Sequence, residues 1–132
     1  MVRQARDTAI PRQTLDRRAG VLVGVAGASA VLLGAFGAHG LKNLFAQNGM
    51  AAVWEKAVFY HFIHAVMLFV LAMRRPVVTG PWLSFLVGII LFSGSLYALA
   101  LTKITWIGFI TPFGGISFIV GWLWLVFVAA KL

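Results

Sequence analysis

The sequence predicts an all-α integral membrane protein: an antiparallel four-helix bundle with both termini in the cytoplasm. Of its 132 residues, 61% are hydrophobic and 11% are charged, and the mean hydropathy is +0.96. An ordinary soluble domain has about 25% charged residues, and so short a chain buries too little surface to hide this many apolar side chains from water. The apolar residues also fall into four long runs, each separated by polar or charged residues. Together these features exclude a soluble globular domain and favour a chain that uses lipid as its solvent.

The first apolar run follows a polar arm. Residues 1–18 are rich in arginine and are expected to form a flexible cytoplasmic arm. Residues 19–38 carry no charge, and a helix of that length crosses about 30 Å of hydrocarbon. A signal peptide is the competing interpretation, because residues 28–30 have the small-x-small form of a cleavage site. The apolar run continues beyond that site, so a retained span is favoured, and residues 19–132 are expected to form one membrane domain.

Three further spans are predicted, at about residues 52–73, 82–101 and 113–130. The second ends at two arginines and a proline, and the third begins after Gly80-Pro81 and ends at Lys103. Residues 106–111 are interpreted as interfacial or re-entrant, since proline removes a backbone donor and the glycines that follow are flexible. Pro112 suits the first turn of the fourth helix.

The distribution of cations predicts the orientation. With four crossings, eight lysines and arginines lie on the side of the termini, and only Lys42, Lys56 and Lys103 lie on the other. Cytoplasmic loops carry the excess of Lys and Arg, so both termini are expected in the cytoplasm. The net charge of +8 does not predict nucleic-acid binding, because the cations flank apolar runs, where they meet lipid headgroups. The eight are the five arginines of the arm, Arg74, Arg75 and Lys131.

Small residues in the first span form two candidate helix-packing faces. In lipid, the usual contact faces are those where small side chains let two backbones approach closely. Two such faces predict a central first helix with two neighbours, although glycine and alanine are also common in membrane helices generally. One face comprises Gly20, Gly24 and Ala28, and the other comprises Ala30, Gly34 and Ala38.

Seven polar residues are expected in the outer half of the membrane. Intramembrane polar groups are costly unless they are partnered, so they need an explanation. Two interpretations stay open: an outward-facing polar pocket for a small or lipid-like ligand, and hydrogen bonds that only hold the helices together. The residues are His39, Tyr60, His61, His64, Ser93, Tyr97 and Thr111.

No catalytic, metal or cofactor site is predicted, and a non-enzymatic protein is favoured. The chain has no cysteine, and His61 and His64 lack the further ligands that zinc requires. Glu55 is the only acid in or near the spans, and it is expected at a helix start, where a carboxylate favours the helix dipole. No acid is therefore placed to orient a histidine for nucleophilic catalysis. Haem held by histidines on two helices, such as His39 with His61, stays open as an alternative.

Several segments, in this order, resemble a widespread family of small membrane proteins. They are GAFGAHGL at residues 34–41, then Trp54 with Tyr60 and His64, then FSGSLY at 92–97, TPFGG at 111–115 and GW at 121–122. The family is known as domain of unknown function 423, or uncharacterised protein family 0382, and the resemblance covers about residues 20–130.

The resemblance implies a four-helix integral membrane protein, located in bacteria in the inner membrane, and it implies no activity. Six of the seven polar residues above, all but His61, fall in its motifs. Phe113 stands where relatives commonly have another apolar residue. The leading hypothesis is thus a non-enzymatic multi-pass protein of the plasma (inner) membrane with an outward-facing polar pocket for a small or lipid-like ligand. The lipid bilayer and a homo-oligomer or membrane-protein partner are its expected contacts. The alternatives are a structural subunit without a ligand and a histidine-ligated redox protein.

Overall fold

The computed structural model describes residues 17–74 and 76–131, and within them the all-helical prediction is confirmed. The predicted arm lies outside the described residues except for Arg17 and Arg18, which begin the first helix. The elements are α1 (Arg17–His39), α2 (Lys42–Asn48), α3 (Ala51–Ala72), α4 (Thr79–Gly88), the π-helical segment η1 (Ile89–Ser93), α5 (Gly94–Thr102), the short 3-10 helix η2 (Thr105–Phe109) and α6 (Thr111–Ala129).

Four helical segments in the described part are long and apolar enough to cross a membrane. Their bounds are Arg17–His39, Ala51–Ala72, Thr79–Thr102 and Thr105–Ala129. Each overlaps one predicted span. The differences lie in the connections: the polar stretch after α1 contains the short helix α2, and residues 105–109 form η2, where Trp106 and Phe109 are exposed. Pro112 does lie in the first turn of α6, where its missing N–H has no partner to lose.

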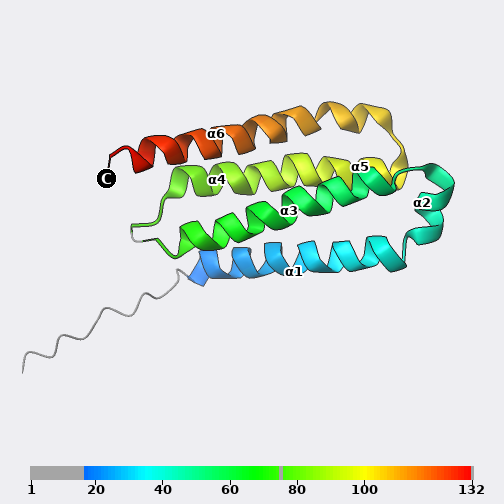
Figure 1. The fold of residues 1–132 in the computed structure, drawn as a ribbon, viewed down its shortest axis with the longest axis horizontal. Coiled ribbons are helices and arrows are strands. Elements are labelled where there is room, and N and C mark those ends of the chain that lie inside the picture. The colour runs from blue at the N-terminus through cyan, green and yellow to red at the C-terminus, as the bar shows by residue number, and fades with distance from the viewer. Residues whose placement is uncertain (1–16, 75, 132) are drawn as a thin grey trace, which may run out of the picture.

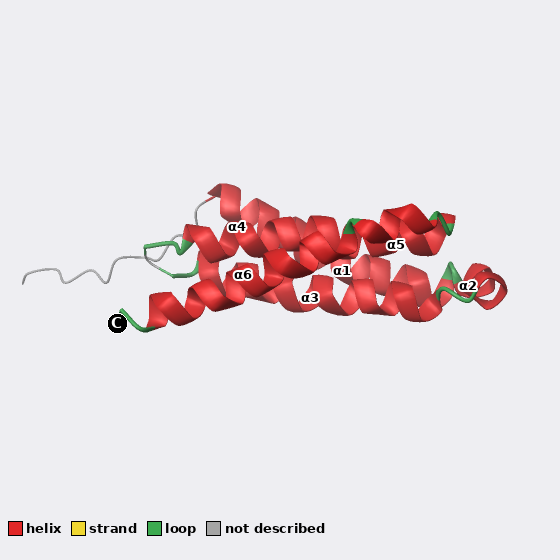
Figure 2. Ribbon diagram, turned by 90° about the horizontal axis from the view of Figure 1, so that it is seen from above, coloured by secondary structure: helices red, strands yellow, loops and turns green. Residues whose placement is uncertain are grey.

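The long helices lie side by side, and their connections alternate between the two ends of the molecule (Figure 1). The start of α1 and the end of α6 lie at one end, and α2 lies at the other. Seen from above, the elements form one elongated stack of helices (Figure 2). The two central segments, α3 and α4–η1–α5, have 39% of their apolar windows buried, against 17% for α1 and for α6. The core therefore lies between α3, α4–η1–α5 and α6.

The central helix is α3 rather than α1, contrary to the expectation of two neighbours for the first span. Helix α1 packs mainly along α3. Helix α3 carries three small side chains of the core, with Ala57 and Ala72 fully buried and Ala65 nearly so. Small residues on α3 let neighbours approach on several sides, which gives it the central position.

The two small-residue faces of α1 have different surroundings. On the second face, Ala30 is buried against α3, and a Cβ at Gly34 would lie 3.3 Å from Val58. On the first face, Gly20 is half-buried, but Gly24 has no neighbouring atom within 4 Å of its Cβ position. Both Ala28 and Ala38 are exposed. Within the described residues, the first face therefore makes little contact with other helices.

The closest approach of α1 to α3 is at a glycine outside both faces. Gly37 is buried, and a Cβ built there would overlap the indole of Trp54. The indole N–H of Trp54 donates to the backbone oxygen of Leu33 on α1, at 2.9 Å. Trp54 therefore ties the N-terminal part of α3 to the C-terminal part of α1.

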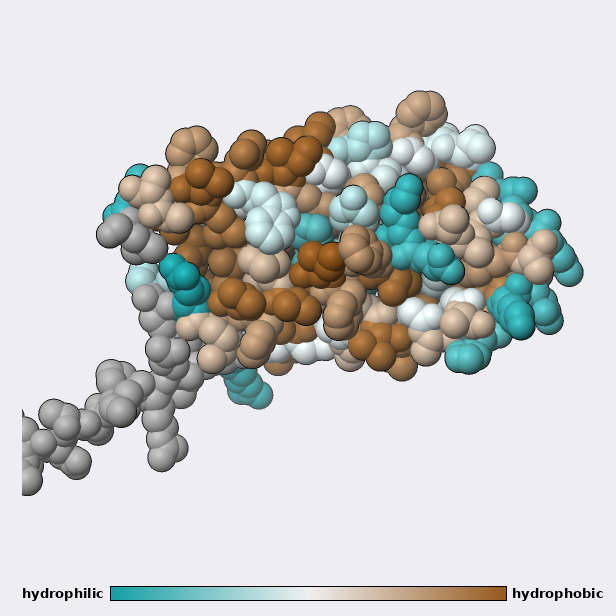
Figure 3. Space-filling model, viewed as in Figure 1, coloured by the Kyte–Doolittle hydropathy of each residue, from teal (hydrophilic) through white to brown (hydrophobic). Residues whose placement is uncertain are grey.

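The visible surface is largely apolar along the helices. Figure 3 shows hydrophobic side chains over much of this face, and hydrophilic ones at the end where α2 lies and in smaller groups elsewhere, including the middle of the face. Many of the exposed apolar side chains belong to α1, α3 and α6, among them Val25, Phe69 and Phe127. In water such a surface would be an aggregation hazard, whereas in a bilayer it is the surface that contacts lipid.

Candidate functional site

His64 projects from α3 toward α6, and both of its ring nitrogens form hydrogen bonds. Nε2 lies 3.2 Å from the indole nitrogen of Trp122, and Nδ1 lies 2.7 Å from the backbone oxygen of Tyr60. Because an indole N–H only donates, Nε2 accepts, and Nδ1 carries the proton that it donates to Tyr60. The ring also stacks on Phe118, with centroids 3.6 Å apart. No lone pair of this neutral imidazole is left for a metal or a ligand.

His61 joins α3 to α5 and faces α1. Its Nδ1 lies 3.2 Å from the hydroxyl oxygen of Tyr97, and the imidazole faces the backbone of Ala26. The ring of Tyr97 packs edge-on against Trp54, with centroids 4.7 Å apart. This cluster therefore links three helices.

Two serines of the third span, Ser93 and Ser95, point to different neighbours. Ser93, at the end of η1, is fully buried and donates to the backbone oxygen of Ala57 on α3, at 2.8 Å. The hydroxyl of Ser95 lies 2.7 Å from that of Thr111 on α6, and it also donates to the backbone oxygen of Phe92. These two serines thus connect the third span to α3 on one side and to α6 on the other.

The last two of the seven predicted polar residues, Tyr60 and His39, are exposed. Tyr60 is 37% exposed, and its ring packs against Phe92 with centroids 4.5 Å apart. His39 is exposed at the end of α1, whereas His61 and His64 are buried residues of α3. Six of the seven residues thus take part in contacts between helices, and His39 does not. Every buried side-chain nitrogen or oxygen in the described part of the chain has a hydrogen-bond partner.

Further polar side chains connect the helices in the same way and were not identified from the sequence. Trp82 donates to the backbone oxygen of Leu68 at 3.1 Å, joining α4 to α3. Ser117 donates to the backbone oxygen of Ser84 at 2.7 Å, joining α6 to α4. Most of these acceptors are backbone carbonyls, which every residue carries, so the sequence holds no signal for them. The sequence did offer one signal for such contacts, the indole N–H groups of Trp54, Trp82 and Trp122. A Trp N–H that is removed from water needs an acceptor.

Removing a single hydroxyl from these contacts between helices is expected to lower the stability of the protein only slightly. Replacing Tyr97 with phenylalanine removes the oxygen that faces His61 and leaves the ring in place. We expect the free energy of unfolding in detergent to fall by about 0.6 kcal/mol, the average for such contacts between membrane helices. Thermal melting followed by circular dichroism measures it. The matched control is Tyr60→Phe, because that hydroxyl makes no hydrogen bond in the described structure; equal losses in both variants would contradict the role given to Tyr97.

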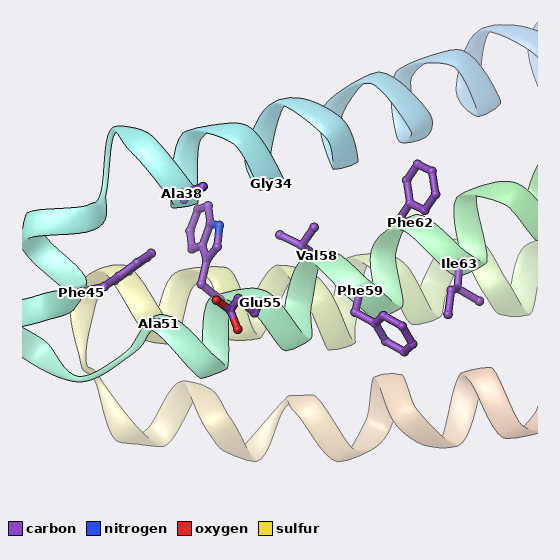
Figure 4. Close-up of a pocket in the computed structure, with 11 residues that line it drawn as sticks. Gly34, Ala38, Phe45, Ala51, Glu55, Val58, Phe59, Phe62 and Ile63 are labelled. Atoms are coloured by element: carbon purple, nitrogen blue, oxygen red, sulfur yellow. The ribbon is translucent and has the colours of Figure 1, made fainter.

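A hollow of about 430 Å³ lies between α1 and α3. Its α1 side is lined by small residues, and Figure 4 shows Val58 and Phe62 projecting from α3 toward α1. Its wall is almost entirely apolar, with Glu55 as the charged lining residue. The lining residues are Gly34, Gly37, Ala38, Phe45, Ala51, Trp54, Glu55, Val58, Phe59, Phe62 and Ile63.

A second hollow, of about 570 Å³, continues the first toward the α2 end of the molecule. The two share Gly37, Ala38, Phe45, Ala51 and Glu55, and the second is also lined by His39, Lys42 and Ala46. The expectation that Glu55 lies at a helix start is wrong: the first turn of α3 contains no acidic residue, and no side-chain cap hydrogen bond forms there. Of the seven predicted polar residues, His39 alone lines either of these two hollows.

The donor set does not fit a metal. In residues 17–74 and 76–131, no group of three or more His, Asp or Glu side chains gathers closely enough to hold an ion. Zinc requires three or four protein ligands, and His64 already uses both nitrogens. Nor does the pairing of His39 with His61 form a haem site here, because His39 is exposed at the end of α1 while His61 is buried against Tyr97.

These features define a multi-pass α-helical membrane protein whose helices are joined by buried polar contacts. The chain belongs to the family described as "Protein of unknown function (DUF423)", whose model matches residues 33–115. The UPF0382 membrane protein YwdK of Bacillus subtilis (strain 168) is 47% identical over 109 residues, which cover 77% of this chain and 87% of the relative. The UPF0382 membrane protein SSP2132 of Staphylococcus saprophyticus is 47% identical over 107 residues, covering 78% and 88%. No solved structure matches the chain.

Proposed function

We propose that the protein is a non-enzymatic membrane protein that holds one lipid-like, amphipathic molecule in the hollow between α1 and α3. The observation that carries this proposal is the continuity of the two hollows, apolar along the helices and lined by charged residues at the α2 end. The apolar part lies between two membrane-spanning helices. Apolar atoms that line a void lose their contacts, so an apolar chain that fills it is stabilised there.

The proposal includes an orientation in the bilayer. The four segments cross the plasma (inner) membrane as an antiparallel bundle with both termini in the cytoplasm. The excess of cations on the side of the termini, eight against three, supports it. In this orientation α2 lies at the outer surface, and the hollow opens into the outer leaflet.

In this proposal the buried polar residues have a structural role. His61, His64, Ser93 and Tyr97 bind partners within the protein. A polar ligand would have to displace these partners, and each partner left buried without a hydrogen bond costs about 1–3 kcal/mol. The ligand is therefore assigned to the α1–α3 hollow, where the apolar wall requires no such exchange.

Filling the hollow tests the proposal. Ala38 is exposed and lines both hollows, so Ala38→Phe places a ring at their junction without removing a hydrogen bond. The protein is reconstituted in nanodiscs of defined phospholipid, released, and weighed by native mass spectrometry. We expect wild type to retain one lipid per chain, and Ala38→Phe to retain at least about tenfold less, because a filled cavity cannot accept an acyl chain.

Two further variants complete the experiment. Ala35→Phe is the matched control, since Ala35 is exposed on the same helix and lines neither hollow; it is expected to retain lipid as wild type does. Ala51→Phe fills the junction from α3 and is expected to act as Ala38→Phe does. Unchanged lipid retention in both filling variants would overturn the proposal. So would a lipid-free dimer that Ala38→Phe dissociates, because the hollow would then hold a second copy of the chain.

A further inference from the structure

The charges at the α2 end of the hollow point to a particular headgroup. We infer that the bound molecule is a phospholipid with a zwitterionic headgroup that carries a primary ammonium, such as an ethanolamine phospholipid. Its phosphate lies near Lys42, its ammonium near Glu55, and one acyl chain lies between α1 and α3. This inference rests on the proposed function above and specifies its ligand.

The length of the hollow fits one acyl chain of one leaflet. Its lining residues on α3 run from Ala51 to Ile63, which is about 18 Å of helix axis. Half the hydrocarbon thickness of a bilayer is about 15 Å. A chain that enters from the α2 end therefore has apolar wall along its whole depth.

Two opposite charges line the hollow at its α2 end. Glu55 lines both hollows and Lys42 lines the second. In the part of the chain that the structure describes, neither side chain forms an ion pair, so each is available to a ligand. An anionic headgroup would meet the repulsion of Glu55 and a cationic one that of Lys42, whereas a zwitterion satisfies both charges.

The carboxylate selects the kind of ammonium. A carboxylate accepts hydrogen bonds, and a primary ammonium donates three, which gives short charge-assisted contacts. A quaternary ammonium donates none and is recognised instead by cages of aromatic faces. Beside Glu55 the second hollow is lined by one aromatic ring, Phe45, together with small residues and two basic side chains. The lining therefore fits an ethanolamine headgroup better than a choline one.

Competition among headgroups tests the inference. Nanodiscs are made with ethanolamine, choline and glycerol phospholipids in equal amounts and with identical acyl chains, and the lipid that remains on the full-length protein is identified by native mass spectrometry. We expect wild type to retain about tenfold more of the ethanolamine lipid than of either of the other two lipids, as charge-assisted hydrogen bonds imply. Soluble phosphoethanolamine at millimolar concentration is expected not to displace the lipid, because it lacks the chain.

Charge variants connect the preference to the two residues. Glu55→Gln is expected to abolish the preference over the anionic glycerol lipid, and Lys42→Gln is expected to lower retention of every phospholipid. Both side chains are exposed and unpaired, so the fold is retained. Lys56→Gln is the matched control, since Lys56 is exposed next to Glu55 but lines neither hollow; it is expected to behave as wild type.

The possible outcomes separate this inference from the proposed function. Retention of one lipid without preference, or equal retention of choline and ethanolamine lipids, overturns the inference and leaves the proposed function in place. Preference for the anionic lipid overturns it too, as does displacement by soluble phosphoethanolamine, which would identify the free headgroup as the ligand. Retention of no lipid at all, with Ala38→Phe indistinguishable from wild type, overturns the proposed function itself.

Discussion

Replacing Gly114 with alanine is expected to lower the free energy of unfolding by about 3 kcal/mol, the upper part of the range for overpacked cores. Gly114 lies where α6 meets η1, and a Cβ built there would overlap the backbone of Phe92. A side chain can rotate away from such a contact, whereas the backbone of a packed helix cannot. Helix α6 would have to move away from η1, which would also strain the contact between Ser95 and Thr111.

The next residue supplies the control. At Gly115 the same substitution places a Cβ 3.8 Å from the ring of Phe92, an ordinary contact. Both glycines lie in the first turns of α6, so the gain in helix propensity, about 1 kcal/mol at most, is similar for both. Reversible unfolding in mixed detergent micelles, followed by circular dichroism, measures the two variants. Equal stability of Gly114→Ala and Gly115→Ala would show that the contact of α6 with η1 is looser than described.

The second large effect is expected from His64→Ala, which should lower the free energy of unfolding by about 2–4 kcal/mol. The substitution leaves a cavity beside Phe118 and removes the acceptor of the Trp122 indole N–H. Truncation of a large core side chain costs about 2–5 kcal/mol, and an indole donor left without an acceptor in lipid adds to it. Detergent melting of the purified variant measures the loss.

Two comparisons separate the contributions at His64. Trp122→Phe removes the indole donor but keeps an aromatic ring, so a smaller loss of about 1 kcal/mol is expected. His39→Ala should leave stability unchanged, because His39 is exposed and forms no hydrogen bond in the described structure. If His64→Ala were as stable as His39→Ala, the structural role proposed for His64 would be wrong.

Periodicity and hydropathy were sufficient to predict the helices. The four charge-poor runs overlap the four candidate spans, because lipid leaves the backbone few alternatives to a helix. Side-chain direction on one helix was also predictable: Ser93 and Tyr97 share a face by spacing, and both contact α3. Ser95 lies two residues after Ser93, so spacing places it on another side of the helix, and it contacts Thr111 on α6.

Contacts between helices were much less predictable. Trp122 and His64 are 58 residues apart, and nothing in either segment indicates that they meet. The position of α1 was misjudged for a related reason. Small residues such as Gly34 and Ala38 indicate that two backbones can approach, but they do not fix which helix approaches or how closely. Here they line a hollow. A hollow forms where no side chain fills the space between two helices, so the sequence contains no pattern that predicts it.

The lateral position of α1 has a consequence for the behaviour of the protein in different membranes. This helix has 23 residues, about 35 Å, and leans mainly on a single neighbour. A helix longer than the local hydrocarbon thickness tilts to accommodate the mismatch, and for α1 such a tilt would change mainly its contacts with α3. Thinner bilayers would thus tilt α1 away from α3 and widen the space between them, so that the occupancy of this space would vary with the thickness of the surrounding membrane.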